Sequence, residues 1–152
     1  MCRLMPIQSN IGVNVEVADI KADIIKKILE IAPTCSKIDY IYIFGSSVEE
    51  RCTEKSDIDI AIVSNVIRSK LFKSKDYMEF TNKLYNIDLE QDYDILQFNS
   101  LKTIQESNDA VCNDILTRGK LIYKREGAST SSGCPFKNSE EKFTLSQKQT
   151  NL

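Results

Sequence analysis

A glycine–serine pair, Gly45-Ser46, is followed after ten residues by Asp57 and Asp59, which stand one residue apart in an apolar run. Side chains two positions apart on a β-strand project from the same face, so these carboxylates would lie close together. Two ionised carboxylates at that separation repel each other and raise each other's pKa unless a cation lies between them. The pattern therefore indicates either a solvated acidic edge strand or a site for a divalent cation.

The residues around this pair favour the cation site. The isoleucines that alternate with the aspartates give the strand an apolar opposite face, so the strand is anchored in a core. The Gly45-Ser46 turn ends another apolar run, residues 37–44, and such a turn offers backbone N–H groups and a hydroxyl to a phosphate. A magnesium ion typically takes one or two carboxylates together with substrate phosphates.

A third carboxylate comes from a later apolar run, residues 91–98, which contains Asp94. Asp92 lies in the same run and on the same face, so it is a rival for this position. Two metal ions held by carboxylates can clamp the attacking and leaving oxygens of a phosphate displacement. The three runs together predict a phosphoryl- or nucleotidyl-transfer site, in which the protein mainly positions the reactants.

The elements that would position these residues alternate between helical and extended patterns, which is typical of an α/β domain. Isoleucines one helical turn apart predict a helix over 17–31, stopped by Pro33, and Ser100 and Gly119 are a plausible cap and stop for a later helix. We expect strands at 37–44, 57–63, 91–98 and 120–124, helices at 17–31, 69–86 and 100–119, and a short helix opening at Ser46 or Ser47.

The composition limits both the organisation and the class of the protein. We assign residues 1–126 to one domain and expect residues 127–152, which are rich in Ser, Thr, Lys and Gln, to form a flexible tail. The net charge of -2 disfavours direct nucleic-acid binding through phosphate neutralisation.

Residue content also bears on location and on metal chemistry. The chain has no histidine, which excludes a Cys/His zinc site and a histidine general base. Its five cysteines are widely spaced, and no apolar run approaches the roughly 20 residues of a membrane span. The N-terminus has no signal-peptide pattern, so we expect a cytoplasmic protein with reduced thiols and no membrane association.

The spacing from Gly45-Ser46 to Asp57-Ile58-Asp59 resembles the signature of the minimal nucleotidyltransferases, small members of the DNA polymerase beta-like nucleotidyltransferase superfamily. The resemblance extends over roughly residues 20–125. It implies a nucleotidyltransferase fold, an α/β domain with a small mixed β-sheet flanked by helices. It also implies ATP as substrate, Mg²⁺ or Mn²⁺ as cofactor, and Gly45 and Ser46 as the triphosphate-binding residues.

Under this resemblance Asp57, Asp59 and Asp94 are the metal ligands and the catalytic carboxylates. Asp94 is preferred to Asp92 because the family places its aspartate just before an apolar stretch, here "ILQF". Asp94 would also help to activate the attacking hydroxyl.

Small proteins of this type resemble the antitoxins of two-gene modules, whose partner is a HEPN-type toxin. The resemblance therefore implies transfer of AMP from ATP to a tyrosine of such a partner. Two alternatives stay open. One is a nucleotidyltransferase acting on an aminoglycoside-like small molecule, which usually needs additional substrate-binding helices. The other is a non-catalytic antitoxin that neutralises its partner by covering it.

Overall fold

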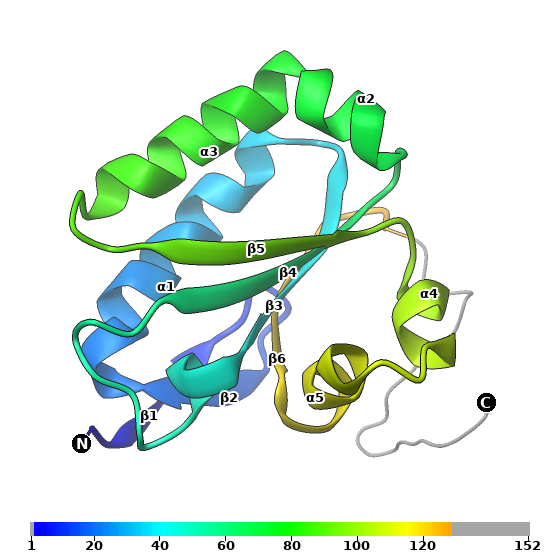
Figure 1. Ribbon diagram of the computed structural model, residues 1–152. Coiled ribbons are helices and arrows are strands. Elements are labelled where there is room, and N and C mark those ends of the chain that lie inside the picture. Colours follow the sequence, from blue (N-terminus) through cyan, green and yellow to red (C-terminus); the bar gives the residue numbers. More distant parts are fainter. Residues whose placement is uncertain (1, 129–152) are drawn as a thin grey trace.

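A four-stranded mixed sheet with the strand order β5-β4-β3-β6 lies at the centre of residues 2–128, which are the residues that the computed structural model describes (Figure 1). Strand β3 pairs antiparallel with both β4 and β6, whereas β4 and β5 run parallel. The strands are β3 (Ile38–Phe44), β4 (Ile58–Ser64), β5 (Tyr93–Phe98) and β6 (Lys120–Lys124). All four strands expected from the sequence are confirmed, with ends that differ by one or two residues.

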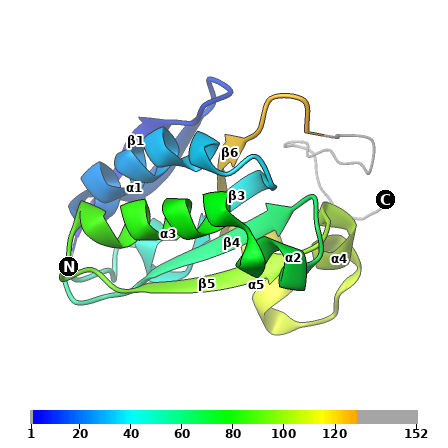
Figure 2. The same cartoon turned by 90° about the horizontal axis from the view of Figure 1, so that it is seen from above.

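Helices cover both faces of the sheet, as the resemblance implied (Figures 1 and 2). On one face α1 (Asp19–Ile31) and α3 (Lys75–Ile87) pack against the isoleucines of β3 and β4. On the other face α4 (Leu101–Glu106) and α5 (Ala110–Arg118) pack against a second cluster. Strand β4 divides its side chains between the two faces as its alternation predicts: Ile58, Ile60 and Ile62 belong to the first cluster, and Ala61 and Val63 to the second.

Two of the expected helices are wrong as continuous elements. The range 69–86 contains α2 (Arg68–Lys73) and α3, which are separated at Ser74. The Ser74 hydroxyl accepts a hydrogen bond from the Tyr77 N–H and so caps the second helix. The range 100–119 likewise contains α4 and α5, and Asp109 caps α5 by accepting from the Val111 N–H. In both ranges the apolar residues keep their helical spacing, but a capping side chain in the middle ends one helix and begins the next.

The predicted limits of this second region are confirmed. The Ser100 hydroxyl caps α4 by accepting from the Thr103 N–H. Gly119 ends α5, and its N–H donates to the carbonyls of Asp114 and Ile115. A Cβ at Gly119 would lie 2.4 Å from the Ile115 carbonyl oxygen, so only glycine fits this stop.

A hairpin precedes the first helix, and the sequence patterns gave no sign of it. Strand β1 (Leu4–Gln8) pairs antiparallel with β2 (Asn14–Ala18) as a separate two-stranded sheet. Because β2 takes residues up to Ala18, α1 begins at Asp19 rather than at residue 17. The helix ends at Ile31, before a short 3₁₀ turn, η1 (Ala32–Thr34), that contains Pro33, as expected.

The short helix expected after the Gly-Ser pair is a single 3₁₀ turn, η2 (Gly45–Val48). Residues 129–152 of the expected tail lie outside the described residues, and Ala128 is buried against the second cluster. No helix among the described residues is both long and apolar enough to cross a bilayer. The four cysteines at described positions are free thiols.

Candidate active site

The paired aspartates lie where β4 begins, next to the beginning of β5. Asp57 directly precedes β4, and Asp59 is its second residue. In the parallel pairing of the two strands, Asp59 stands directly opposite Asp94. The three predicted carboxylates are therefore brought to one end of two neighbouring strands, and Asp92 lies before β5 begins. The side chains of Asp59 and Asp94 project from the same face of the sheet, because residues directly opposite each other on paired strands share a face.

The Gly45 backbone lies against the carboxylate of Asp59. Strand β3 runs antiparallel to β4, and its last residue, Phe44, pairs with Asp59, which places the following turn beside the aspartate. A Cβ built on Gly45 would lie 2.0 Å from the Asp59 Oδ2, far inside any permitted contact. Gly45 also has a φ of 71°, a conformation that other residues adopt only with strain. Both the turn and the close approach therefore require glycine.

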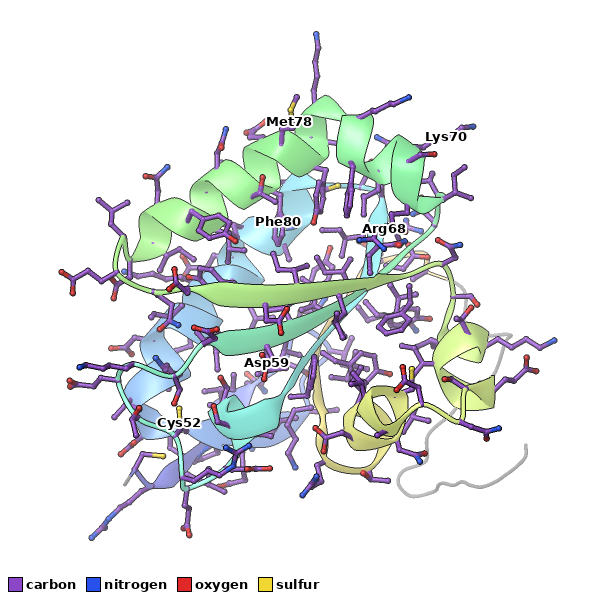
Figure 3. The ribbon with its side chains drawn as sticks, in the orientation of Figure 1. Cys52, Asp59, Arg68, Lys70, Met78 and Phe80 are labelled. Atoms are coloured by element: carbon purple, nitrogen blue, oxygen red, sulfur yellow. The ribbon has the colours of Figure 1, made fainter. Side chains whose placement is uncertain are left out.

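The environment of Asp59 disfavours its charge. Burial, followed by the negative charges of Asp94 and Asp57, raises the pKa of Asp59 to about 6. The Arg51 guanidinium acts in the opposite direction and lowers the pKa. Asp59, labelled in Figure 3, is half-buried. Asp57 and Asp94 are exposed. A carboxyl group whose neighbours hinder its ionisation is a group that a bound cation would stabilise.

Charged residues from the loop after η2 and from α5 surround this site. The Glu49 Oε1 accepts one hydrogen bond from the Arg51 Nε, and the Arg118 Nη1 lies 3.9 Å from the Glu49 Oε2. Arg118 also donates from Nε to Asp114 Oδ1 at 2.7 Å. These contacts bring two guanidinium groups beside the Gly-Ser turn, because α5 packs next to η2.

The donor set suits a hard divalent cation such as Mg²⁺. Carboxylate oxygens are the ligands that such ions prefer, and the space between Gly45 and Asp59 is one that a Cβ would fill. In the side-chain positions of residues 2–128, no three Asp, Glu or Cys groups converge into a finished metal cage. Mg²⁺ does not require one, because it usually binds one or two carboxylates and takes its other ligands from water and substrate phosphates.

The two serines of the turn differ in their surroundings. Ser46 is half-buried and follows the glycine directly. The Ser47 side chain is fully buried, and its hydroxyl has no hydrogen-bond partner among the described residues. A buried hydroxyl without a partner is costly, so Ser47 is an unfavourable group within the turn.

A shallow hollow of about 350 Å³ lies at the opposite ends of β4 and β5, and its lining residues are Asn65, Val66, Ile67, Lys70 and Asn99. The aspartates stand at the beginning of the same strands. The hollow is therefore separate from the chemistry, and the candidate site is open at the edge of the sheet.

The structure brings together Gly45, Asp59 and Asp94. Ser46 directly follows Gly45, and Asp57, two positions before Asp59, is close enough for its charge to raise the pKa of Asp59. The sequence patterns did not place Asp114 or Arg118 near the turn. Their position depends on how α5 packs against the sheet, and no spacing in the sequence signals that packing.

Comparison with known proteins gives a family and a fold. A family model described as Polymerase beta, Nucleotidyltransferase matches residues 26–128. No curated protein shows significant similarity to the chain. Among solved structures, a mutant of the MntA–HpeT toxin–antitoxin is similar with 21% identity and a TM-score of 0.46, over 67% of this chain and 74% of that one.

Two further solved structures are similar at the same level. One is a tri-AMPylated Shewanella oneidensis HEPN toxin in complex with MNT antitoxin, with 21% identity and a TM-score of 0.43, covering 70% of this chain and 75% of that chain. The other is a toxin–antitoxin with AMP-PNP, with 23% identity and a TM-score of 0.44, covering 69% of this chain and 74% of that chain.

Proposed function

This chain belongs to the polymerase beta nucleotidyltransferase family, and from that premise we propose that it transfers AMP from ATP to a hydroxyl group of a protein partner. The partner we infer is a HEPN-type toxin, with a tyrosine as acceptor, so that the chain acts in the cytoplasm as an antitoxin. The observation that carries the proposal is the register of the parallel pair, which sets Asp94 opposite Asp59 beside Gly45.

Each motif residue has a role in the proposed reaction. Asp57 and Asp59 would hold Mg²⁺, which when bound supplies positive charge at the phosphates. Gly45 and Ser46 would hold the triphosphate through backbone N–H groups and the hydroxyl. Asp94, exposed on the edge strand, would take the proton from the attacking hydroxyl. A bond forms between that oxygen and the α-phosphorus, and pyrophosphate leaves.

The openness of the site supports a macromolecular acceptor. Small-molecule sites are concave and bury most of the ligand's surface. Asp57 and Asp94 are instead exposed, and β5 is the edge strand of the sheet. A hydroxyl on the surface of a folded partner could reach these carboxylates without entering a pocket. This reasoning favours a protein acceptor over an aminoglycoside-like one.

The proposal is tested by the intact mass of the partner. The candidate partner is the product of the neighbouring gene, incubated with the full chain, ATP and Mg²⁺. We expect a gain of one AMP group or a small multiple of it. Asp94→Asn should abolish this gain, and Asp92→Asn, a matched change two residues away in the sequence, should retain it.

Two other outcomes would refute the proposal. Adenylylation of a small molecule by the same preparation, with no mass gain on the partner, would establish the small-molecule alternative. Neutralisation of the toxin by Asp94→Asn as effective as that by the unaltered chain, again with no mass gain, would establish an antitoxin that acts by covering its partner.

A further inference from the structure

Lys21 is a buried cation at the start of α1, and its side chain is 2% exposed. Lysine is almost never fully buried unless its charge is paired. The residue also stands in the first turn of a helix, where the macrodipole favours acidic side chains. Among the described residues, no Asp or Glu forms a salt bridge with Lys21. Because both the burial of the Lys21 ammonium and its position in the first turn are unfavourable, specific contacts must compensate for them.

The contacts of Lys21 reach two loops far apart in the sequence. Its Nζ donates to the Glu54 carbonyl oxygen at 3.0 Å and to the Gln91 Oε1 at 2.6 Å. Glu54 lies in the loop that leads into Asp57, and Gln91 lies in the loop that leads into β5. The ammonium thus joins the two chain segments that carry the candidate carboxylates to the body of α1.

The Gln91 side chain extends this connection to the backbone on either side of the site. Its Nε2 donates to the Ser56 carbonyl at 3.0 Å and to the Asp92 carbonyl at 2.7 Å. The amide orientation is fixed by Lys21, because an ammonium can only donate and so must face the oxygen. The Asp92 carbonyl also accepts from the Ile58 N–H at 3.1 Å.

These bonds hold the chain on both sides of Asp57. The preceding carbonyl, that of Ser56, is bound by Gln91, and the following N–H, that of Ile58, is bound by the carbonyl of Asp92. The same bonds hold the Asp92 carbonyl next to β4, directly before β5 begins and two residues before Asp94. One amide and one ammonium therefore add to the strand pairing that sets the relative position of the carboxylates.

We propose that Lys21 and Gln91 are positioning residues that hold Asp57 and Asp94 in register for cation and nucleotide binding. The role in binding rests on the proposed function, but the clamp itself is a property of the fold. Residues that orient metal ligands typically change affinity or activity by roughly tenfold to a hundredfold when they are removed. Neither residue is expected to touch the substrate.

The test compares Lys21→Met and Gln91→Leu with Lys27→Met, which removes an exposed lysine from the same helix. Lys21→Met keeps an apolar stem of similar length but has no donor, and Gln91→Leu keeps the volume but loses the amide. Amide hydrogen exchange is measured by NMR on each full chain without ligand. The Ile58 amide should exchange about tenfold faster or more in the first two variants, while core amides such as Ile41 and Ile62 keep their protection.

Mn²⁺ binding and AMP transfer are then measured on the same proteins. Relative to Lys27→Met, we expect Mn²⁺ to bind roughly tenfold to a hundredfold more weakly and kcat to fall by a similar factor. Unchanged Ile58 exchange, or exchange that rises equally throughout the core, would overturn the proposal. Should Lys21→Met fail to fold, Gln91→Leu decides alone. Absence of transfer or Mn²⁺ binding in the unaltered chain would refute the proposed function, whereas the exchange result would still decide whether the clamp exists.

Discussion

The close approach of Gly45 to Asp59 makes a quantitative prediction about Gly45→Ala. The substitution has two separable costs. A residue with a side chain at a φ of 71° pays about 1–2 kcal/mol for the left-handed conformation. In addition, the new Cβ would lie 2.0 Å from the Asp59 Oδ2, so the carboxylate must retreat to the 3.4 Å or more of ordinary contact. Turning a side chain away from its preferred rotamer costs about 0.5–1.5 kcal/mol.

Gly12 provides a matched control for the backbone cost. It has a φ of 84°, and a Cβ there would meet no atom within 4 Å. Gly12→Ala should therefore lower the free energy of unfolding by about 1–2 kcal/mol, and Gly45→Ala by roughly 1 kcal/mol more. Urea unfolding at neutral pH resolves this difference if the slope of the transition is unchanged.

A double-mutant cycle identifies the atom responsible. Asp59→Ala removes the Oδ2 and Cγ atoms that a Cβ on Gly45 would meet and leaves only the Cβ, at an ordinary 3.4 Å. In that background Gly45→Ala should cost no more than Gly12→Ala. In the unaltered background, Gly45→Ala should also weaken binding of Mn²⁺ with a non-hydrolysable ATP analogue by roughly tenfold to a hundredfold, since the carboxylate is displaced by more than 1 Å. Equal costs of Gly45→Ala with and without Asp59→Ala would refute this reasoning.

Three further predictions concern the carboxylates. The pKa of Asp59 is raised from 3.8 to about 6, so the native state holds this proton more tightly than the unfolded chain does. The resulting stabilisation of the native state is largest below pH 3.8 and is lost as the pH rises past 6. Asp59→Asn should abolish this pH dependence of the melting temperature. Mn²⁺ with a non-hydrolysable ATP analogue should raise the melting temperature of the unaltered chain, and the same rise in the double variant Asp57→Asn/Asp59→Asn would contradict the metal assignment. Asp94→Asn should reduce kcat more than it weakens ATP binding, as kinetics and calorimetry would show, and Asp92→Asn should change neither by more than about twofold.

The central sheet was predictable because each strand has an unambiguous local pattern. Strand β4 alternates between faces, and its isoleucines pack on α1 and α3 as the alternation requires. The N-terminal hairpin has no such signal. Pro6 lies within β1, and a proline in an apolar run argues against a strand unless the strand lies at an edge. The hairpin has only two strands, so this exception applies.

The helix breaks were missed for a different reason. An apolar period that continues through a cap looks like one helix, and Ser74 and Asp109 are polar residues that a surface helix could also contain. Whether such a residue caps a helix depends on the direction that the chain must take over the sheet. The contacts of Lys21 were equally invisible, because Gln91 is 70 residues away in the sequence. The motif could be recognised locally, whereas the residues that support it could not.

The register between β4 and β5 is the point at which fold and chemistry depend on each other. A slip of one residue in β5 would turn Asp94 to the opposite face of the sheet, where Ile58 and Ile60 pack in the core. Burying an unpaired carboxylate there would be strongly unfavourable, so the core itself opposes that slip. A slip of two residues keeps the same face and would set Asp92 opposite Asp59, but it would also set Asp94 opposite buried Ala61, in the place of Leu96, which packs against the second cluster. The bonds of Gln91 to the Ser56 and Asp92 carbonyls belong to the observed register. The start of β5 and its apolar side chains therefore both select Asp94, and not Asp92, as the partner of Asp59.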